Sequence, residues 1–517
     1  MSGYAGFPVD GGPNAVVRTR WSGRDPFIAR CGAAACALPS LHFADFTNGG
    51  IGMPEIDSRI LPLTYAQQGV WFSQHLDPTS PKYNISECFE VAGRVDENAF
   101  AEAVATAVEE CESLHVEFFT VDGLPYQRQL PTRRIPPTLV DLTGHSDPPA
   151  AAERLMAEDL RRPADPTRPA ELFVHLLIKL AEDRYFWYSR YHHLVMDGLS
   201  VSLMGHRVAE VYTARVHGTA AEPRNTSLRA LVDSDQTYRE SPEYARDRAY
   251  WADRFPDFPA PETLLPRRAA ATGVATGVTG GAGTGPDAGP PTGTETGPDA
   301  PPLLHVAEGL GAEVLAGLKA VGRAARTSWS AVAVAATALH VARATGAADV
   351  MLGLTTNGRA GALGDIPGMT ANVVPLHVRI SPGMTVGELV KDVAAEIRGA
   401  LRHRRYSREM LVRDMKISGG PNPMTSLVVN VMPYDYGLVF GDAPAKSRIL
   451  STGPVDEIAF FLSERSEGMG PLIGFDANPD LYPPESLAPH QRAIVGLLTS
   501  LSHARPETPV AALDAVS

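Results

Sequence analysis

A tract rich in glycine, threonine, alanine and proline divides this chain of 517 residues into two long parts. It runs from about Arg267 to Pro302 and holds almost no bulky apolar side chain from which a hydrophobic core could be built. We therefore predict a disordered linker over residues 261–302, between two lobes at 58–260 and 303–503. Each lobe has roughly 200 residues, which is enough for a core of its own.

The two ends of the chain are predicted to lie outside these lobes. Residues 1–57 mix Gly, Pro and scattered charges without a hydrophobic period, which is typical of a disordered extension. Met53 stands just ahead of the first recognisable motif, so a start at Met53 instead of Met1 is a further hypothesis. Residues 504–517 are predicted to form a tail.

Both lobes mix strand and helix patterns. In the first lobe, residues 186–191 are aromatic and roughly alternating, as in a strand, and an apolar period of three and four residues starts at Leu199, as in a helix. In the second lobe, the same patterns predict helices at 314–325, 328–345 and 386–401, and strands at 350–354, 373–380, 426–432, 458–462 and 472–475. Strands mixed with amphipathic helices predict two α/β lobes.

Composition argues against several classes of protein. The formal net charge of −13 disfavours a nucleic-acid binder, which needs a basic face to meet phosphates. No apolar run reaches the roughly 20 residues that span a bilayer, and no signal peptide is recognisable, so we expect no membrane association and a cytoplasmic location. The four cysteines do not make a disulfide scaffold. Cys31 and Cys36 lack a second pair of metal ligands nearby, so we expect no metal site.

The residues that carry chemistry lie where the first-lobe strand meets the helix. Residues 191–198 read Tyr-His-His-Leu-Val-Met-Asp-Gly, with two histidines at the end of the strand and Asp-Gly at the turn. A turn at this place can aim an imidazole into a cleft as a general base, with a carboxylate nearby. An arbitrary pair of histidines more often packs in the core or lies on the surface. The position of this pair favours catalysis, and acyl transfer is the leading hypothesis.

This segment resembles the HHxxxDG signature of the condensation domains of nonribosomal peptide synthetases, in the chloramphenicol-acetyltransferase-like superfamily. Further segments between about 58 and 503 resemble the other motifs of that family in the same order, and they are 61–71, 112–114, 244–251, 357–359, 368–376 and 421–423. Within the family, three segments resemble siderophore-type synthetases such as the enterobactin synthetase, and they are 188–193, 402–407 and 450–456.

The resemblance implies a fold and a set of roles. The fold is a V-shaped pseudo-dimer of two chloramphenicol-acetyltransferase-like α/β lobes, with the active site between them. His193 is then the catalytic base, or the group that holds the nucleophile in line. His192 is a second catalytic or positioning residue, with a packing role equally open. Asp197 braces the loop through an ion pair, and Gly198 permits the tight turn.

Two positions depart from the family pattern. Many condensation domains have arginine at the position of Gly69, where it pairs with the aspartate of the signature. The partner of Asp197 must therefore be another residue here, and Arg190 and Arg359 are the candidates. The second motif, which normally reads Arg-His-Glu, reads Glu-Cys-Glu at 110–112. These changes leave the histidines untouched and alter the ion pairs around them.

The implied reaction joins a carrier-bound acyl or peptidyl thioester to the amine of a carrier-bound aminoacyl acceptor. No adenylation or carrier-protein motif is visible, so we expect a free-standing, monomeric enzyme that meets peptidyl or acyl carrier proteins in trans. We expect no bound cofactor, because the phosphopantetheine arms belong to the carriers. The alternatives are an ester-forming acyltransferase with an alcohol acceptor and a non-catalytic recruitment domain. Epimerisation and heterocyclisation are disfavoured, since their own motifs are not found.

Two further features concern the surfaces that substrates meet. Arg359 and Asn372 are expected at the floor of the channel, where Asn372 shapes the crossing between the lobes. A basic cluster on this acidic chain consists of Arg402, Arg404, Arg405 and Arg408. Such a cluster is usually a solvated helix end. Because carrier domains tend to be acidic, a part in carrier docking is the alternative.

Overall fold

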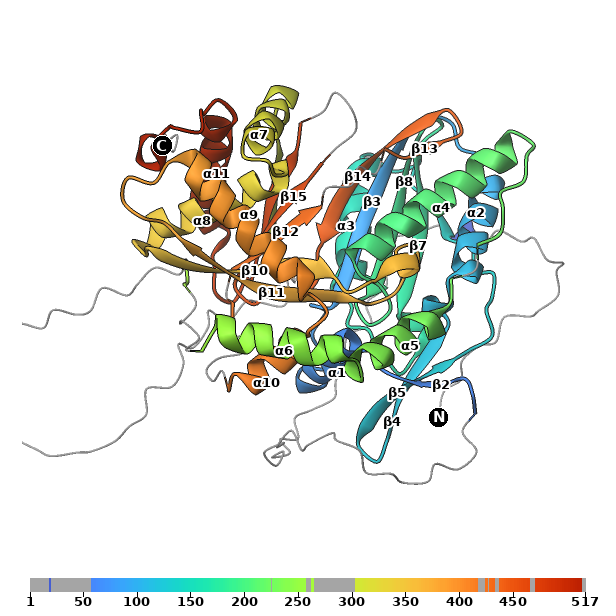
Figure 1. Cartoon of the computed structure of the whole chain (residues 1–517). Coiled ribbons are helices and arrows are strands. Elements are labelled where there is room, and N and C mark those ends of the chain that lie inside the picture. Colours follow the sequence, from blue (N-terminus) through green and yellow to red (C-terminus); the bar gives the residue numbers. More distant parts are fainter. Residues whose placement is uncertain are drawn as a thin grey trace, which may run out of the picture.

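The computed structural model describes residues 18–19, 57–224, 226–256, 262–264, 303–416, 424–425, 427–432, 437–464 and 470–513. Several predictions fall outside these ranges, namely those on most of 1–57 (with Cys31, Cys36 and Met53), on most of 261–302, on 421–423 and on 514–517. Figure 1 shows two lobes side by side, with the N-terminal half in blue and green and most of the C-terminal half in yellow to red.

The first lobe is built around a sheet with the strand order β1-β6-β7-β8-β3-β14-β13. The first half supplies β1 (Arg18–Thr19), β3 (Asn84–Ala92), β6 (Thr138–Asp141), β7 (Phe173–Ala181) and β8 (Arg184–His192). A small separate sheet, β2-β5-β4, consists of β2 (Ile60–Pro62), β4 (Val116–Val121) and β5 (Leu124–Gln129). The helices are α1 (Tyr65–Leu76), α2 (Glu97–Glu110), α3 (Pro148–Leu160), α4 (Gly198–Val216), α5 (Leu228–Arg239) and α6 (Pro242–Arg254).

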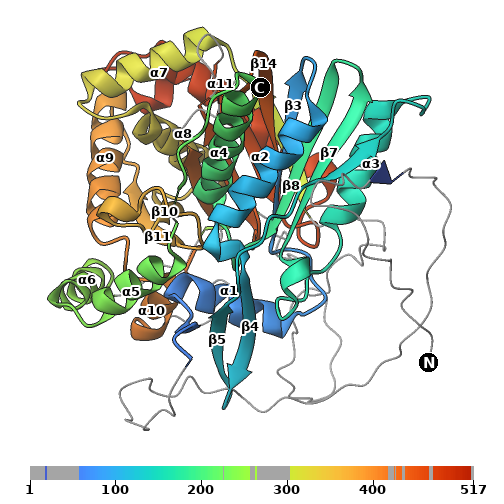
Figure 2. The same ribbon diagram turned by 90° about the vertical axis from the view of Figure 1, so that its right-hand side faces the viewer.

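Strand β8, which ends in the histidine motif, is buried on both faces. Because side chains alternate along a strand, Trp187 and Tyr191 share one face and pack with residues of α2 and α4. Phe186 and Tyr188 face the other way and pack with residues of α3. Figure 2 shows α2 and α4 running alongside each other over the sheet. This double cover fixes the end of β8, from which the motif continues.

The second lobe has a sheet with the order β11-β10-β12-β15-β16-β9. Its strands are β9 (Leu304–Gly309), β10 (Asp349–Asn357), β11 (Ala371–Arg379), β12 (Leu427–Met432), β15 (Ile458–Ser463) and β16 (Leu472–Ala477). Its helices are α7 (Ala312–Ala324), α8 (Trp329–Thr345), α9 (Val386–Arg402), α10 (Arg408–Asp414) and α11 (Leu487–Ser502). Every helix and strand predicted for this half is present, with ends shifted by a few residues. The expected mixture of helix and sheet is confirmed in both lobes.

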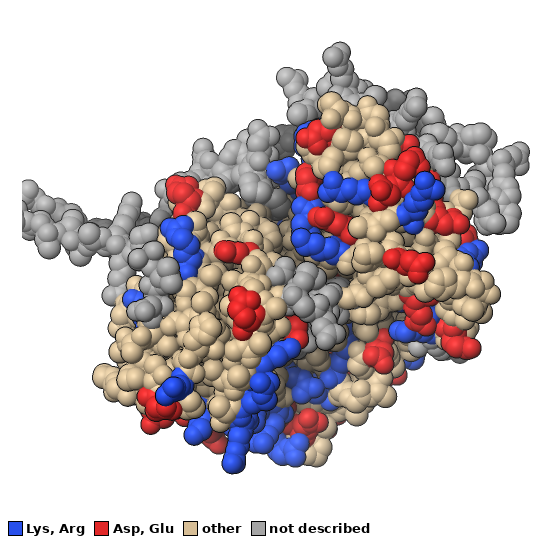
Figure 3. Space-filling view, turned by 90° about the horizontal axis from the view of Figure 1, so that it is seen from above, with Lys and Arg blue, Asp and Glu red and all other residues tan. Residues whose placement is uncertain are grey.

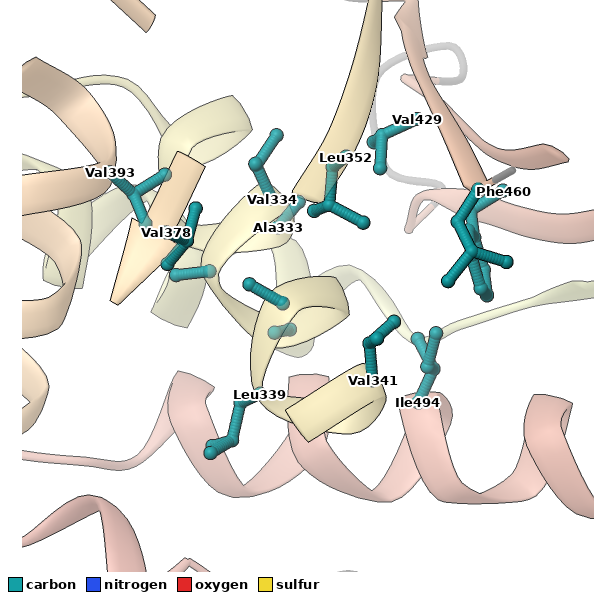
Figure 4. Close-up of a cluster of buried hydrophobic side chains, with 14 of the residues drawn as sticks. Ala333, Val334, Leu339, Val341, Leu352, Val378, Val393, Val429, Phe460 and Ile494 are labelled. Carbon is teal, nitrogen blue, oxygen red and sulfur yellow. The ribbon is translucent and has the colours of Figure 1, made fainter. Parts of the chain in front are cut away.

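Helix α8 forms the centre of the second core. It is rich in Ala and Val, its residues 331–342 are buried, and it packs against α7, α9 and α11. A helix that is apolar all round is stable only when its neighbours enclose it. Figure 4 shows α8 residues such as Val334 and Val341 among side chains of the sheet and of α11, including Leu352 and Ile494. Gly346, with a φ of +76°, ends the helix.

The two halves exchange segments. Strands β13 (Val439–Phe440) and β14 (Ala443–Ser451) come from the C-terminal half, yet β14 pairs antiparallel with β3 in the sheet of the first lobe (Figure 1). In return, Trp251 of α6 packs in the core of the second lobe. The lobe boundaries at 58–260 and 303–503 stay predictions, but hydrogen bonding and packing cross them. Among the described residues, no helix combines the length and apolar character needed to cross a membrane.

Candidate active site

His193 follows directly on the last residue of β8. Its backbone N–H donates to the carbonyl of Tyr83 at 2.8 Å. Its Nδ1 lies 2.9 Å from the carbonyl oxygen of Met196, so Nδ1 carries the proton and donates it. The lone pair is then on Nε2, which has no hydrogen-bond partner among the described residues. The local turn thus engages Nδ1 of His193 in a hydrogen bond and leaves Nε2 able to accept a proton.

The electrostatic surroundings keep this imidazole neutral. Burial lowers the pKa of His193, against the opposing effects of the Asp197 charge and the Met196 carbonyl. A neutral imidazole with Nε2 unprotonated can accept a proton from a nucleophile within hydrogen-bond reach. The geometry and the charge state of His193 therefore both suit a general base.

Gly453, from the C-terminal half, lies against the edge of the same ring. Its φ is +101°, and a Cβ at this position would stand 2.7 Å from Cδ2 and 3.1 Å from Nε2 of His193. The backbone can approach the ring this closely because residue 453 has no side chain. Tyr83 and Gly453 thus bring both halves of the chain to His193, as expected for a site between the lobes. No role was predicted for Gly453, although the Gly453-Pro454 pair is a turn signal.

His192 is placed quite differently. It is 1% exposed, and its Nδ1 accepts from the backbone N–H of Leu194 at 3.2 Å. Its Nε2 then carries the proton and faces Oε1 of Gln74 at 3.3 Å. Burial lowers the pKa of His192 to about 3, and the neighbouring His193 and Arg190 add to this effect. Both nitrogens are occupied by the protein, so these contacts favour the positioning role over the catalytic one.

Asp197 forms a buried ion pair with Arg359. The guanidinium binds in bidentate fashion, with Nη1 2.7 Å from Oδ2 and Nη2 3.1 Å from Oδ1. Ser200 donates its N–H and its hydroxyl to Oδ1 at 3.0 and 2.7 Å, and Thr370 donates its N–H and its hydroxyl to Oδ2, each at 3.1 Å. Burial alone would raise the pKa of Asp197, but Arg359 and the other donors lower it to about 2.

The hydrogen bonds around Asp197 identify its ion-pair partner. Arg359 is that partner, whereas Arg190 donates to Asp159 at 2.7 Å. Asp197 is also the N-cap of α4, because its side chain accepts from the backbone N–H of Ser200, so it begins the helix and holds the turn. Gly198 is the first residue of α4 and is not among the described glycines with positive φ, so its role in permitting the turn stays a prediction. The carboxylate of Asp197 holds the turn through its bond to the Ser200 N–H.

Arg359 and Asn372 both line a small cavity of about 50 Å³. Asn372 donates to the carbonyls of Arg404 and Tyr406 at 2.8 and 2.9 Å and accepts from the N–H of Arg408 at 3.0 Å. It therefore ties the start of β11 to the segment that leads into α10. A channel-floor role for the two residues stays a prediction.

With this geometry established, the comparisons with known proteins identify the family. Residues 57–279 and 305–494 match the family model of the condensation domain. The chain belongs to the condensation domain family. A dimodular nonribosomal peptide synthase of Bacillus subtilis (strain 168) is 37% identical over 87% of this chain, and an isonitrile lipopeptide synthase of Streptomyces coeruleorubidus is 36% identical over 84%. Enterobactin synthase component F of Escherichia coli (strain K12) is 28% identical over 86%, which confirms the resemblance to siderophore-type synthetases.

This condensation domain spans 18%, 28% and 32% of the lengths of those three proteins. Two solved structures share its fold. One is a mutant of the starter condensation domain of rhizomide synthetase RzmA in complex with C8-CoA and Leu-SNAC, with a TM-score of 0.76, 31% identity and coverage of 89% of this chain and 98% of that one. The other is the first condensation domain of the calcium-dependent antibiotic synthetase in complex with a substrate analogue, with a TM-score of 0.75, 32% identity and coverage of 88% and 100%. Condensation domains form amide bonds by acyl transfer, and the two-lobed α/β fold expected here is theirs.

The two departures of this condensation domain have a structural explanation. A Cβ at Gly69 would stand 2.3 Å from Oε1 of Glu409, so the Glu409 side chain occupies the space next to residue 69, and Asp197 pairs with Arg359 instead. Burial raises the pKa of Glu409, while Arg408 acts in the opposite direction. In the second motif, Glu110 binds Arg207 of α4 through two contacts of 2.7 Å. The altered motif thus braces the helix that Asp197 starts.

The basic cluster is largely engaged inside the condensation domain. Arg404 donates to the carbonyls of Asn357, Leu401 and Arg359, at 2.9, 2.9 and 3.1 Å. Arg405 donates to the carbonyl of Ser234 at 2.8 Å. These contacts favour a structural role over carrier docking for both arginines. On the face in Figure 3, acidic and basic side chains occur across both lobes.

Proposed function

We propose that this condensation domain joins a carrier-bound acyl or peptidyl thioester to the amine of a carrier-bound aminoacyl acceptor, and that the carriers act in trans. The observation that carries the proposal is the neutral His193 with its unoccupied Nε2. The amine nitrogen attacks the thioester carbonyl, the carbon–nitrogen bond forms, and the nitrogen gives a proton to Nε2. The carbon–sulfur bond then breaks, and the departing sulfur takes up that proton as the free phosphopantetheine thiol.

The related structures support the pairing of substrates. The RzmA starter condensation domain is in complex with C8-CoA and Leu-SNAC, which are one acyl and one aminoacyl compound. The same pairing applied to this chain gives an acyl donor and an aminoacyl acceptor.

The two buried thiols offer no competing nucleophile, because burial raises the pKa of Cys88 and of Cys111 to about 12.

The neighbouring residues are assigned supporting roles. His192 holds the end of β8 through Gln74 and the backbone of Leu194, and so fixes where His193 stands. Asp197 and Arg359 hold the start of α4 against the segment before β11, which ties the two halves of the chain together. Neither role requires contact with substrate.

The test is single-turnover transfer between two phosphopantetheinylated carrier proteins, followed by mass spectrometry of the carriers. We expect transfer by the wild-type protein and no reaction with free amino acids. His193→Ala should lower the rate by roughly 10² to 10⁴, the usual contribution of a positioned acid–base group, with a nearly unchanged melting temperature. His217→Ala, at the exposed end of α4, is the control and should leave the rate unchanged.

His192→Ala separates the two histidines. Its kinetic defect should be smaller, and the free energy of unfolding should fall by about 1 to 3 kcal/mol, because Gln74 and the Leu194 N–H lose a buried partner. Turnover that survives His193→Ala undiminished would contradict the assignment of His193 as the base. Absence of transfer by the wild-type protein would favour a recruitment domain. Faster transfer to an alcohol than to an amine acceptor would favour the ester-forming alternative.

A further inference from the structure

The segment 451–453 sets the space beside the reactive nitrogen of His193. A Cβ on Gly453 would stand 3.1 Å from Nε2, so the path of this short segment decides how much room a nucleophile has there. The segment begins at the end of β14, in the sheet of the first lobe, and leads towards β15 in the second. It is therefore a bridge between lobes whose position must be fixed from both sides.

On the side of the first lobe, Ser451 fixes the segment. Its hydroxyl donates to the carbonyl of Asn84 at 2.8 Å, and it accepts from the N–H of Gly453 at 3.3 Å. Asn84 is the first residue of β3 and pairs with His192 of β8. Through Asn84, this hydrogen bond therefore connects the bridge to β8, the strand that ends in the histidine motif.

On the side of the second lobe, Asp476 of β16 fixes the segment. Its Oδ2 accepts from the hydroxyl of Thr452. Its Oδ1 faces Nδ1 of His305 on β9 at 2.7 Å, and the His305 ring stacks on Phe461 with a centroid distance of 5.4 Å. The carboxylate is 0% exposed and forms no ion pair with a Lys or Arg among the described residues.

A fully buried carboxylate is costly unless its hydrogen bonds are satisfied. A strand interior could hold an apolar residue at this position without that cost. Asp476 instead aims one oxygen at the bridge beside His193 and has the other oriented by His305. The arrangement links Asp476 to the catalytic ring through two successive residues, Thr452 and Gly453.

We propose that Asp476 is a positioning residue of the active site, which holds Gly453 at its distance from His193 through the hydroxyl of Thr452. The proposal rests on the function proposed above and adds a residue to the same site. It predicts that loss of this one hydroxyl affects the rate of transfer and not the binding of carriers, since displacement of a reacting geometry by about 1 Å can cost up to 10²-fold in rate.

The test is Thr452→Val, which keeps the shape of the side chain and removes its hydroxyl. In the carrier-to-carrier assay, we expect the single-turnover rate at saturating carrier to fall about 10-fold to 100-fold, with an unchanged apparent carrier affinity. Thr452→Ser restores the hydroxyl and should recover most of the rate. The matched control is Thr337→Val in α8, where a buried threonine hydroxyl bonds to the carbonyl of Ala333 in the core of the second lobe. It should keep the wild-type rate.

Rates are compared well below the melting temperature of each variant, so that loss of folded protein does not enter. A wild-type rate for Thr452→Val, in an assay where His193→Ala is inactive, would overturn this inference alone. An equal loss for Thr452→Val and Thr452→Ser would also overturn it, because the hydroxyl would then not be the cause. If His193→Ala itself keeps full activity, the proposed function fails first, and the inference fails with it.

Discussion

Asp197 is a buried carboxylate surrounded by donors from both halves of the chain. Arg359 supplies a charge, and Ser200 and Thr370 supply hydrogen bonds, so the group is stabilised as the anion despite its burial. The ordinary pKa of 3.8 is accordingly lowered to about 2. Since the pKa is lower in the folded state, folding is favoured when the group is ionised.

This lowered pKa gives a prediction for Asp197→Asn. Near pH 7 the variant should lose about 3 to 5 kcal/mol of unfolding free energy, because Arg359 is left buried without its counter-ion. The contribution of the wild-type carboxylate is complete above about pH 4 and is lost as the pH falls towards 2. The difference between wild type and variant should therefore shrink by about 2 kcal/mol between pH 5 and the acid limit. Urea unfolding at a series of pH values measures this.

The control for this series is Asp253→Asn on α6, where the side chain is exposed. It should follow the wild type at every pH. If the gap between wild type and Asp197→Asn is as wide at pH 3 as at pH 7, the ion pair is not its source. If the Asp197→Asn variant is as stable as the wild type yet inactive, a direct catalytic role for Asp197 becomes the better assignment.

At the scale of elements, β14 decides how the lobes are joined. It starts and ends in the C-terminal half, yet it pairs with β3 of the first lobe over most of its length. Ile449 on β14 packs against Met432 of β12 and Phe461 of β15, which belong to the second lobe. One strand therefore contributes to both sheets, through its backbone to one and through a side chain to the other.

We predict that Ile449→Ala destabilises both lobes together. Removal of a buried isoleucine side chain costs about 2 to 5 kcal/mol, and Ile449 is 8% exposed. Unfolding is followed in single-tryptophan variants that retain Trp187 in the first lobe or Trp329 in the second. Both transitions should shift to lower denaturant by the same amount. Ile135→Ala, at a residue 39% exposed, should shift neither, and a shift confined to one tryptophan would show that β14 does not couple the lobes.

At the scale of the whole molecule, the tract at 267–302 connects two fixed points. Before it, Thr263 and the N–H of Leu264 both donate to Glu457 at 2.8 Å. After it, β9 starts at Leu304 and pairs with β16. The lobes also meet through β14 and through the pair of Asp197 and Arg359. Covalent connection through the tract is therefore one of several links between the halves.

We predict that this tract can be shortened without loss of the fold. A deletion that retains about ten of its residues should melt within a few degrees of the parent, since loop-closure free energy changes by only about 0.6 kcal/mol per halving of length. Differential scanning calorimetry measures the difference. The matched control extends the deletion through 262–264, which removes the contacts with Glu457 and should lower the melting temperature. A collapse in soluble yield with the shorter deletion would show that the tract packs.

The amino-acid sequence by itself determined what depends on near neighbours. Hydrophobic periods placed the helices and strands of the second half, because burial repeats every 3.6 residues in a helix and every 2 in a strand. The change of period after residues 186–191 placed the histidines at a strand end. Composition marked the tract at 267–302, and the order of motifs indicated the family.

The tertiary structure decided what depends on residues far apart in the chain. The choice of Arg359 over Arg190 as the partner of Asp197, the entry of β14 into the sheet of the first lobe and the contact of Gly453 with His193 all join segments separated by more than 150 residues. Periodicity and propensity describe a side chain relative to its own helix or strand. They carry no information about which distant segment covers it, and folding selects that segment through packing and pairing of the whole chain.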